Sequence, residues 1–225
     1  MSARGRGSPV RAVLFDLDGT LLDTAPDMVG AMNALLAEEC LPPVRFDTAR
    51  AQVSHGSNGL MRIAFPGIEG EAFERLRDRF LALYRARLVD ETDLFPGGAE
   101  LLEYLEGAAL PWGVVTNKPG WLAEPLLAEL GLAARMACLV SGDTLPMRKP
   151  SPEPLLHAAG AIGVPPAECV YVGDALRDVE AARAAGMRAV VASFGYVSAA
   201  DEHLLWPAEA WIDSPAALVR WLEGT

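Results

Sequence analysis

Two aspartates near the start of the chain have the residue types and spacing best suited to chemistry. Asp16 and Asp18 follow directly on the apolar segment 12–15, and Gly19 comes next. Because side chains at positions i and i+2 of a strand point to the same face, both carboxylates are predicted to stand together at a strand tip. Such a pair can hold a divalent cation, and a carboxylate in such a pair can attack an electrophile.

Further polar residues follow other apolar segments along the chain. They are Thr116 and Asn117 after segment 112–115, Lys149 after segment 138–140, and Asp174 and Asp178 after segment 169–172. In an open α/β sheet, ligands bind at the edge formed by the carboxyl ends of the parallel strands. The order of these groups therefore predicts one site that includes Asp16 and Asp18.

The acidic residues predict a magnesium site. Mg²⁺ takes oxygen ligands and keeps several waters, so it needs few protein groups. Asp16, Asp174 and the backbone carbonyl of Asp18 would supply them. Asp178 would bind a water ligand of the metal rather than the metal itself.

The remaining residue types predict phosphoryl transfer. Asp16 would be the nucleophile and form an aspartyl-phosphate, while Asp18 would protonate the leaving oxygen and then activate water. Lys149, the Thr116 hydroxyl and N–H groups near Asn117 would neutralise the transferring group. Each of these residues alone is compatible with an ordinary turn, cap or surface position, but their ordered combination favours a catalytic site.

The elements that would position these residues alternate along the chain. Continuous apolar runs at 12–15, 112–115, 138–140, 169–172, 189–192 and 210–212 suit strands buried on both faces of a parallel sheet. Helical patterns lie between them at 99–106, 122–130, 154–162 and 176–185, and a glycine follows each of the last three. The chain is predicted to be an α/β protein with a doubly wound, Rossmann-like parallel sheet.

The first crossover is far longer than the ~12 residues that a βαβ connection needs. Apolar residues at helical spacing predict helices over 26–39 and 71–88, and a third over 57–65 with Ser57 as its N-cap. Residues 24–93 are therefore predicted to form an inserted helical lobe, and 10–23 with 94–225 the core. Residues 1–9 are expected to be a disordered lead-in.

Composition narrows the class of protein. The 225-residue chain has a net charge of −11, which disfavours a general binder of nucleic acid or of anionic membranes, and makes a metal more necessary for phosphate chemistry. The sequence has no transmembrane-length apolar run and no signal-peptide pattern. Its three cysteines are widely spaced, which indicates reduced thiols and a cytoplasmic protein. The protein is expected to be a monomer or homodimer.

The site residues form four motifs, namely Asp16 with Asp18, Thr116 with Asn117, Lys149, and Asp174 with Asp178. In these motifs the chain resembles the phosphatases of the haloacid dehalogenase (HAD) superfamily. The resemblance runs from Val10 to Leu222 and implies a Mg²⁺-dependent aspartyl-phosphate mechanism, with the insertion as a helical C1 cap. Within the superfamily the chain is similar to the phosphoglycolate phosphatase group, and more narrowly to bacterial N-acetylmuramic acid 6-phosphate phosphatases. This implies a small phosphorylated metabolite as substrate.

The predicted lobe contains one loop suited to substrate binding. His55, Gly56, Ser57 and Asn58 combine hydrogen-bonding side chains with a glycine that permits close approach, and Arg62 lies about one turn further on, where it would pair with a carboxylate. The alternative is an ordinary loop that leads into a helix.

Other functions share the same core. A phosphosugar mutase would return the phosphoryl group to a sugar rather than to water. A dehalogenase has no use for a leaving-group acid at Asp18. A non-catalytic phosphate-sensing interaction protein would typically lack Asp16, Asp18, Lys149 or Asp174, and all four are present.

Overall fold

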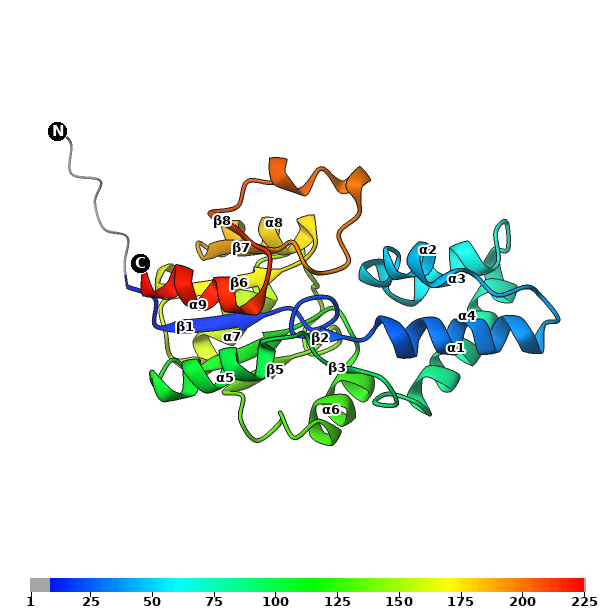
Figure 1. Cartoon of the computed structure of the whole chain (residues 1–225), viewed down its shortest axis with the longest axis horizontal. Helices are drawn as coiled ribbons and strands as arrows, with labels where there is room; N and C mark the ends of the chain where they lie inside the picture. Colours follow the sequence, from blue (N-terminus) through cyan, green and yellow to red (C-terminus); the bar gives the residue numbers. More distant parts are fainter. Residues whose placement is uncertain (1–8, 225) are drawn as a thin grey trace.

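The computed structural model describes residues 9–224. All of the predicted lead-in except Pro9 therefore lies outside the described residues. The ribbon in Figure 1 has a sheet-containing core, with a group of helices, α1 to α4, on one side of it.

A six-stranded parallel sheet forms the centre of the core. Its strands are β1 (Ala12–Phe15), β4 (Trp112–Val115), β5 (Cys138–Val140), β6 (Cys169–Gly173), β7 (Arg188–Ala192) and β8 (Ala210–Ile212). Their order is β5-β4-β1-β6-β7-β8, and every pairing is parallel. The predicted fold class is confirmed. The chain winds outward from β1 first to one side and then to the other, so the carboxyl end of β1 lies at the topological switch point.

Helices cover both faces of this sheet. They are α5 (Gly98–Gly107), α6 (Gly120–Glu129), α7 (Glu153–Ile162), α8 (Leu176–Ala184) and α9 (Pro215–Glu223), with short 3₁₀ turns at Pro166–Glu168, Ala199–Asp201 and His203–Leu205. Residues of β1 alternate between two hydrophobic clusters. Val13 and Phe15 belong to the cluster that includes α5, α6 and α9, and Ala12 and Leu14 to the one that includes α7 and α8. Burial on both faces explains the continuous apolar runs.

The helix ends follow the predicted glycines closely. Gly131, Gly163 and Gly186 adopt φ angles of +71°, +75° and +74°, which is the left-handed backbone that terminates a helix. A side chain with a Cβ atom adopts this conformation only at a cost, so glycine is favoured at all three positions.

The long first crossover contains the predicted helices and some further elements. It runs through β2 (Leu22–Asp23), α1 (Ala25–Glu38), α2 (Phe46–Arg50), a 3₁₀ turn (Val53–His55), α3 (Gly56–Ala64), α4 (Gly70–Arg85) and β3 (Asp93–Leu94). Strands β2 and β3 pair antiparallel where the chain leaves and re-enters the core. The prediction of Ser57 as N-cap is wrong, since α3 begins at Gly56 and His55 occupies the cap position.

A buried aspartate ties the two connecting segments together. The Asp27 side chain is fully buried, and its Oδ2 atom accepts hydrogen bonds from the Thr92 amide and hydroxyl, both at 2.8 Å, and from the Glu91 amide at 3.0 Å. These bonds join the first turn of α1 to the returning strand. The connection between α1–α4 and the core is therefore specified by polar contacts as well as by packing.

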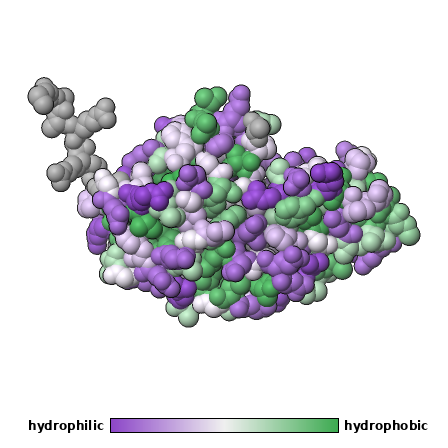
Figure 2. All heavy atoms as spheres, viewed as in Figure 1, coloured by the Kyte–Doolittle hydropathy of each residue, from purple (hydrophilic) through white to green (hydrophobic). Residues whose placement is uncertain are grey.

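The surface of this face is chemically mixed. Polar and apolar side chains alternate over both the core and the helical lobe in Figure 2. Within residues 9–224, no helix combines the length and the apolar character that a membrane span requires.

Candidate active site

Three carboxylates meet at the switch point of the sheet. Asp16 follows β1, while Asp174 and Asp178 follow β6, and each offers an oxygen within 4.8 Å of the others. All three side chains are buried, and the Asp174 Oδ1 atom lacks a hydrogen-bond partner within the described residues. Carboxylates packed this closely away from water repel one another unless a cation lies among them. The donor set is all oxygen, so it fits a hard divalent cation.

Lys149 provides one positive charge to this cluster. Its Nζ atom lies 2.9 Å from Asp16 Oδ1 and 2.9 Å from Asp178 Oδ1, and it also donates to the Val115 carbonyl at 3.0 Å and to the Tyr171 hydroxyl at 2.7 Å. Burial alone would raise the pKa of Asp16, but the positive charges of Lys149 and Arg177 outweigh it and lower that pKa. Asp16 is thus held as the carboxylate that a nucleophile must be.

Asp18, the predicted general acid, is held by contacts that the sequence did not indicate. Asp18 Oδ1 accepts hydrogen bonds from the Thr24 hydroxyl and from Lys118 Nζ, both at 2.7 Å. Lys118 also donates to the hydroxyl of Tyr84, a residue of α4, at 2.9 Å. This chain of contacts links the helical lobe directly to the catalytic edge of the core.

Thr116 and Asn117 occupy the end of β4 as predicted, and both line the cavity described below. The side-chain nitrogen of Asn117 donates to the Lys149 backbone carbonyl at 3.0 Å, and its Oδ1 atom accepts from the Lys149 backbone amide at 3.1 Å. The side chain of Asn117 therefore holds the loop that carries Lys149. The Thr116 hydroxyl accepts a hydrogen bond from the Lys118 amide at 3.1 Å, which orders the turn after β4.

Glycine is required at the turn that follows Asp18. Gly19 has a φ angle of +83°, and a Cβ atom there would collide with the Asp174 carboxylate and the Tyr196 ring. The DxDG pattern thus allows the loop after β1 to pass close to the acidic cluster.

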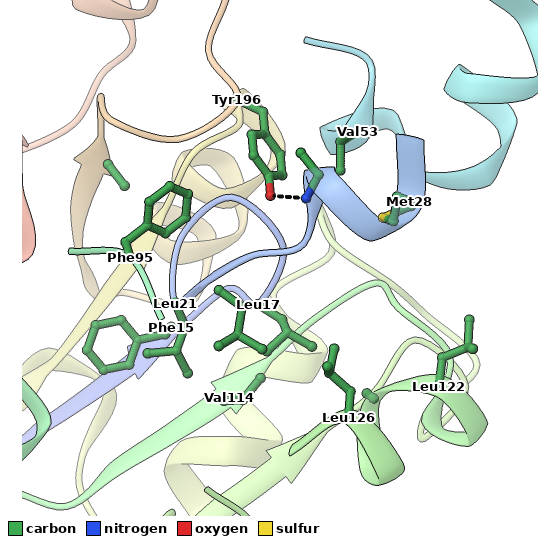
Figure 3. Packing of buried hydrophobic residues seen from close by; sticks show 14 of the residues in the cluster. Phe15, Leu17, Leu21, Met28, Val53, Phe95, Val114, Leu122, Leu126 and Tyr196 are labelled. Atoms are coloured by element: carbon green, nitrogen blue, oxygen red, sulfur yellow. Dashed lines mark hydrogen bonds between the residues drawn. The ribbon is translucent and has the colours of Figure 1, made fainter. Parts of the chain in front are cut away.

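Tyr196 connects this loop to the start of the lobe. Its hydroxyl accepts from the Ala25 amide at 2.8 Å, the bond drawn in Figure 3, and donates to Asp23 at 2.9 Å. Its own amide donates to Asp174 Oδ2 at 2.9 Å, and the guanidinium carbon of Arg50 lies 4.8 Å from its ring centroid. Tyr196 is four residues beyond the end of β7, and that position alone carries no sequence signal for this role.

A cavity of about 670 Å³ lies between the helical lobe and the core. Asp16, Asp18, Thr116 and Asn117 line it on the core side, and His55, Gly56, Ser57 and Asn58 line it on the lobe side. The neighbouring Ser54 donates to Asp174 Oδ2 at 2.7 Å. The structure thus brings the predicted loop to the predicted catalytic groups. Arg62 is exposed and is not among the described residues that line the cavity.

Asp174 makes the stability of the metal-free protein depend on pH. Burial, followed by the charges of Asp16 and Asp178, raises the pKa of Asp174 from 3.8 to about 7. Between those values the folded state binds more protons than the unfolded state, so folding becomes less favourable as the pH rises through that window. We expect metal-free protein to be more stable near about pH 5.5 than near about pH 8 in chemical denaturation.

The variant Asp174→Asn is the control for this pH dependence. It removes the titrating group while keeping the shape of the side chain, so the difference between the two pH values should shrink. A wild-type stability that does not change between about pH 5 and 8 would contradict the expectation.

Comparisons with known proteins agree with this geometry. A family profile of haloacid dehalogenase-like hydrolases matches residues 10–186. A phosphoglycolate phosphatase of Xanthomonas campestris is 49% identical over 92% of this chain and 94% of its own length. An N-acetylmuramic acid 6-phosphate phosphatase of Pseudomonas putida is 44% identical over 93% and 94%, respectively.

Solved structures show the same fold. The crystal structure of a predicted phosphoglycolate phosphatase from Haemophilus somnus superposes with a TM-score of 0.84 at 26% identity, and the match covers 94% of this chain and 97% of that one. The chain therefore belongs to the haloacid dehalogenase-like hydrolase family and is a phosphatase within it.

Proposed function

We propose that the protein hydrolyses a phosphomonoester through an aspartyl-phosphate on Asp16, with Mg²⁺ as its cofactor. The observation that carries this proposal is the buried cluster of Asp16, Asp174 and Asp178, with Lys149 paired to Asp16 and Asp178. Asp16, Asp174 and the Asp18 carbonyl would hold Mg²⁺, and Asp178 would bind one of its water ligands. The cation would supply positive charge to the phosphoryl oxygens.

The first half of the reaction transfers the phosphoryl group to the enzyme. A carboxylate oxygen of Asp16 attacks phosphorus, and the bond from phosphorus to the ester oxygen breaks. Asp18 gives its proton to the departing oxygen, so the leaving group departs as an alcohol. Thr24 and Lys118 both bond Oδ1 of Asp18, so its Oδ2 is the oxygen that would serve the leaving group.

The second half returns the enzyme to its starting state. Asp18 takes a proton from a water molecule, whose oxygen attacks phosphorus, and the bond from phosphorus to Asp16 breaks. Phosphate leaves, Asp16 is again a carboxylate and Asp18 is again protonated. Lys149, Thr116 and the backbone near Asn117 stabilise the charge on the phosphoryl oxygens in both steps.

The substrate is proposed to be a small phosphorylated metabolite that carries a carboxylate. The relatives named above are a phosphoglycolate phosphatase and an N-acetylmuramic acid 6-phosphate phosphatase, and both of these esters bear one. The cavity suits an ester with such a second negative charge. Four cationic side chains, Arg77, Lys118, Arg148 and Arg177, line it against the two carboxylates Asp16 and Asp18.

Residues 24–93 are proposed to act as a cap over a core of residues 10–23 and 94–225. Water exclusion by such a cap would favour transfer of the phosphoryl group to Asp16 before hydrolysis. We place the protein in the cytoplasm, where its three cysteines, which are free in the structure, would stay reduced. We further predict that the protein is a monomer or homodimer and that it binds neither nucleic acid nor membranes.

The test is phosphate release from a panel of esters, measured with and without Mg²⁺. The panel contains 2-phosphoglycolate, N-acetylmuramic acid 6-phosphate and simple hexose phosphates. Release that requires Mg²⁺ and needs no added sugar bisphosphate supports hydrolysis over a mutase reaction. An intact fold with no release from any ester would overturn the proposal.

A further inference from the structure

The cavity continues well beyond the catalytic groups along helix α4. Arg77, Leu81 and Tyr84 of this helix all line it. Their spacing of four and then three residues places them on one face of the helix. Figure 3 shows Met28 and Val53 on the lobe side and Leu122 on the core side, and these three residues line the same cavity.

Tyr84 marks the catalytic end of this face. Its hydroxyl lies 2.9 Å from Lys118 Nζ, which in turn lies 2.7 Å from Asp18 Oδ1. Arg77 is seven residues earlier on α4, which corresponds to about 10 Å along the helix axis. Because helical side chains lean toward the N-terminus of their helix, Arg77 extends further from the end marked by Tyr84. This placement favours a leaving group longer than the two-carbon chain of phosphoglycolate.

The present partners of Arg77 are two acidic residues of its own helix. It pairs with Glu74 through both terminal nitrogens, with Nη1 3.2 Å from Oε1 and Nη2 in contact with Oε2, and its Nη2 atom lies 4.0 Å from Asp78. The side chains of Glu74 and Asp78 are 52% and 73% exposed. Both acids are largely in contact with water, which screens their charges, so a ligand carboxylate in the cavity can compete with them for Arg77.

The other cations of the cavity, Lys118, Arg148 and Arg177, are on core segments. Lys118 is paired with Asp18, and Arg177 lies 3.9 Å from Asp16. Arg148 immediately precedes Lys149 on the core side. The distal end thus carries its own arginine, apart from those suited to the phosphate.

The walls between these two ends suit a sugar-sized group. Met28, Val53 and Leu81 provide apolar contact, while His55, Ser57 and Asn58 provide hydrogen-bonding groups. The volume of about 670 Å³ is within the range of pockets that enclose a drug-sized ligand.

We propose that Arg77 is a specificity-determining residue that binds a carboxylate on a sugar-sized leaving group. The substrate class is a sugar phosphate whose carboxylate is remote from the phosphate. This inference rests on the phosphatase function proposed above, and it assigns to Arg77 the role that the sequence suggested for Arg62.

The experiment compares two esters that differ by one acidic group. N-acetylmuramic acid 6-phosphate carries a lactyl carboxylate, and N-acetylglucosamine 6-phosphate lacks it. We expect the wild-type protein to prefer the carboxylated ester at least tenfold in kcat/KM. Arg77→Gln should lower kcat/KM for that ester by about 10- to 100-fold, mainly through KM, and reduce the ratio between the two esters toward one.

Arg75→Gln is the matched control. Arg75 is on the same helix, its side chain is 69% exposed, and it pairs only loosely with Glu71 at 3.6 Å. This variant should keep the wild-type ratio between the two esters. Equal turnover of both esters by the wild-type protein, or equal losses for both in Arg77→Gln, would overturn the role of Arg77.

Calorimetric binding separates this inference from the proposed reaction. The Asp16→Asn protein is titrated with N-acetylmuramic acid 6-phosphate, with and without Arg77→Gln. Binding that is at least tenfold weaker in the double variant supports the subsite even if no ester is hydrolysed, a result that would overturn only the reaction. Unchanged binding rejects the subsite and leaves the reaction to the phosphate-release assay.

Discussion

Replacing Asp16 by asparagine is expected to abolish phosphate release, with kcat lowered by about 10⁴-fold or more. An amide oxygen is a far weaker nucleophile than a carboxylate. The nearby carboxylates Asp18 and Asp178 pair with Lys118 and Lys149 and have other predicted roles. The assay is phosphate release at saturating Mg²⁺ with the best ester of the panel. A second readout is the acid-stable phosphoenzyme, which should form in the wild-type protein and be absent from the variant.

Asp47→Asn provides the control for loss of a negative charge. Asp47 is on α2, and its side chain is 85% exposed, so this variant should retain wild-type turnover. Circular dichroism establishes that both variants are folded. Turnover by a folded Asp16→Asn protein within tenfold of wild type would exclude Asp16 as the nucleophile.

Replacing Lys149 by methionine is expected to affect stability as well as activity. The Lys149 side chain is fully buried and lies 2.9 Å from both Asp16 and Asp178. Methionine fills a similar volume but leaves these carboxylates without their buried cation, which costs about 3–5 kcal/mol of unfolding free energy. Chemical denaturation of metal-free protein measures this loss, and phosphate release should fall by several orders of magnitude.

Arg148→Met tests whether the effect comes from burial. Arg148 is the preceding residue and is exposed, so removing its charge should change the free energy of unfolding by less than about 0.5 kcal/mol. A Lys149→Met protein as stable as Arg148→Met would show that the acidic cluster does not depend on the lysine.

The sheet and its catalytic edge could be predicted because their signals are local. A strand buried on both faces needs a continuous apolar run, and a chain that ends a helix in the left-handed conformation needs glycine. Once the strands are known to be parallel, their carboxyl ends must share one edge. Asp16, Thr116, Lys149 and Asp174 could therefore be grouped from their order along the chain.

Several elements had weaker local signals. Helix α2 spans five residues and strands β2 and β3 two each, which is too short for a hydrophobic period to emerge. Helix α9 was not predicted, although Ser214 followed by Pro215 is a common helix start. The choice of Ser57 as N-cap followed residue preference, whereas the 3₁₀ turn before α3 decided where that helix begins.

Contacts between distant segments were decided by the tertiary structure alone. Lys118 and Tyr84 are 34 residues apart in the chain, and only the position of α4 over the core brings their polar atoms together. The same docking makes Arg77 part of the cavity lining and leaves Arg62 exposed. Sequence spacing predicts which side chains share one face of a helix. Which face lines the cavity depends on how the helix packs against another element.

The sequence by itself determined the type of chemistry, because residue identity and strand position decide which groups can meet a phosphate. The tertiary structure decided which groups the leaving group meets, because the cavity is bounded by segments that the chain brings together only on folding. The core motifs are short and adjoin strands, so local rules suffice for them. The cap side of the cavity depends on how four helices pack over the sheet edge, and no local pattern encodes that arrangement.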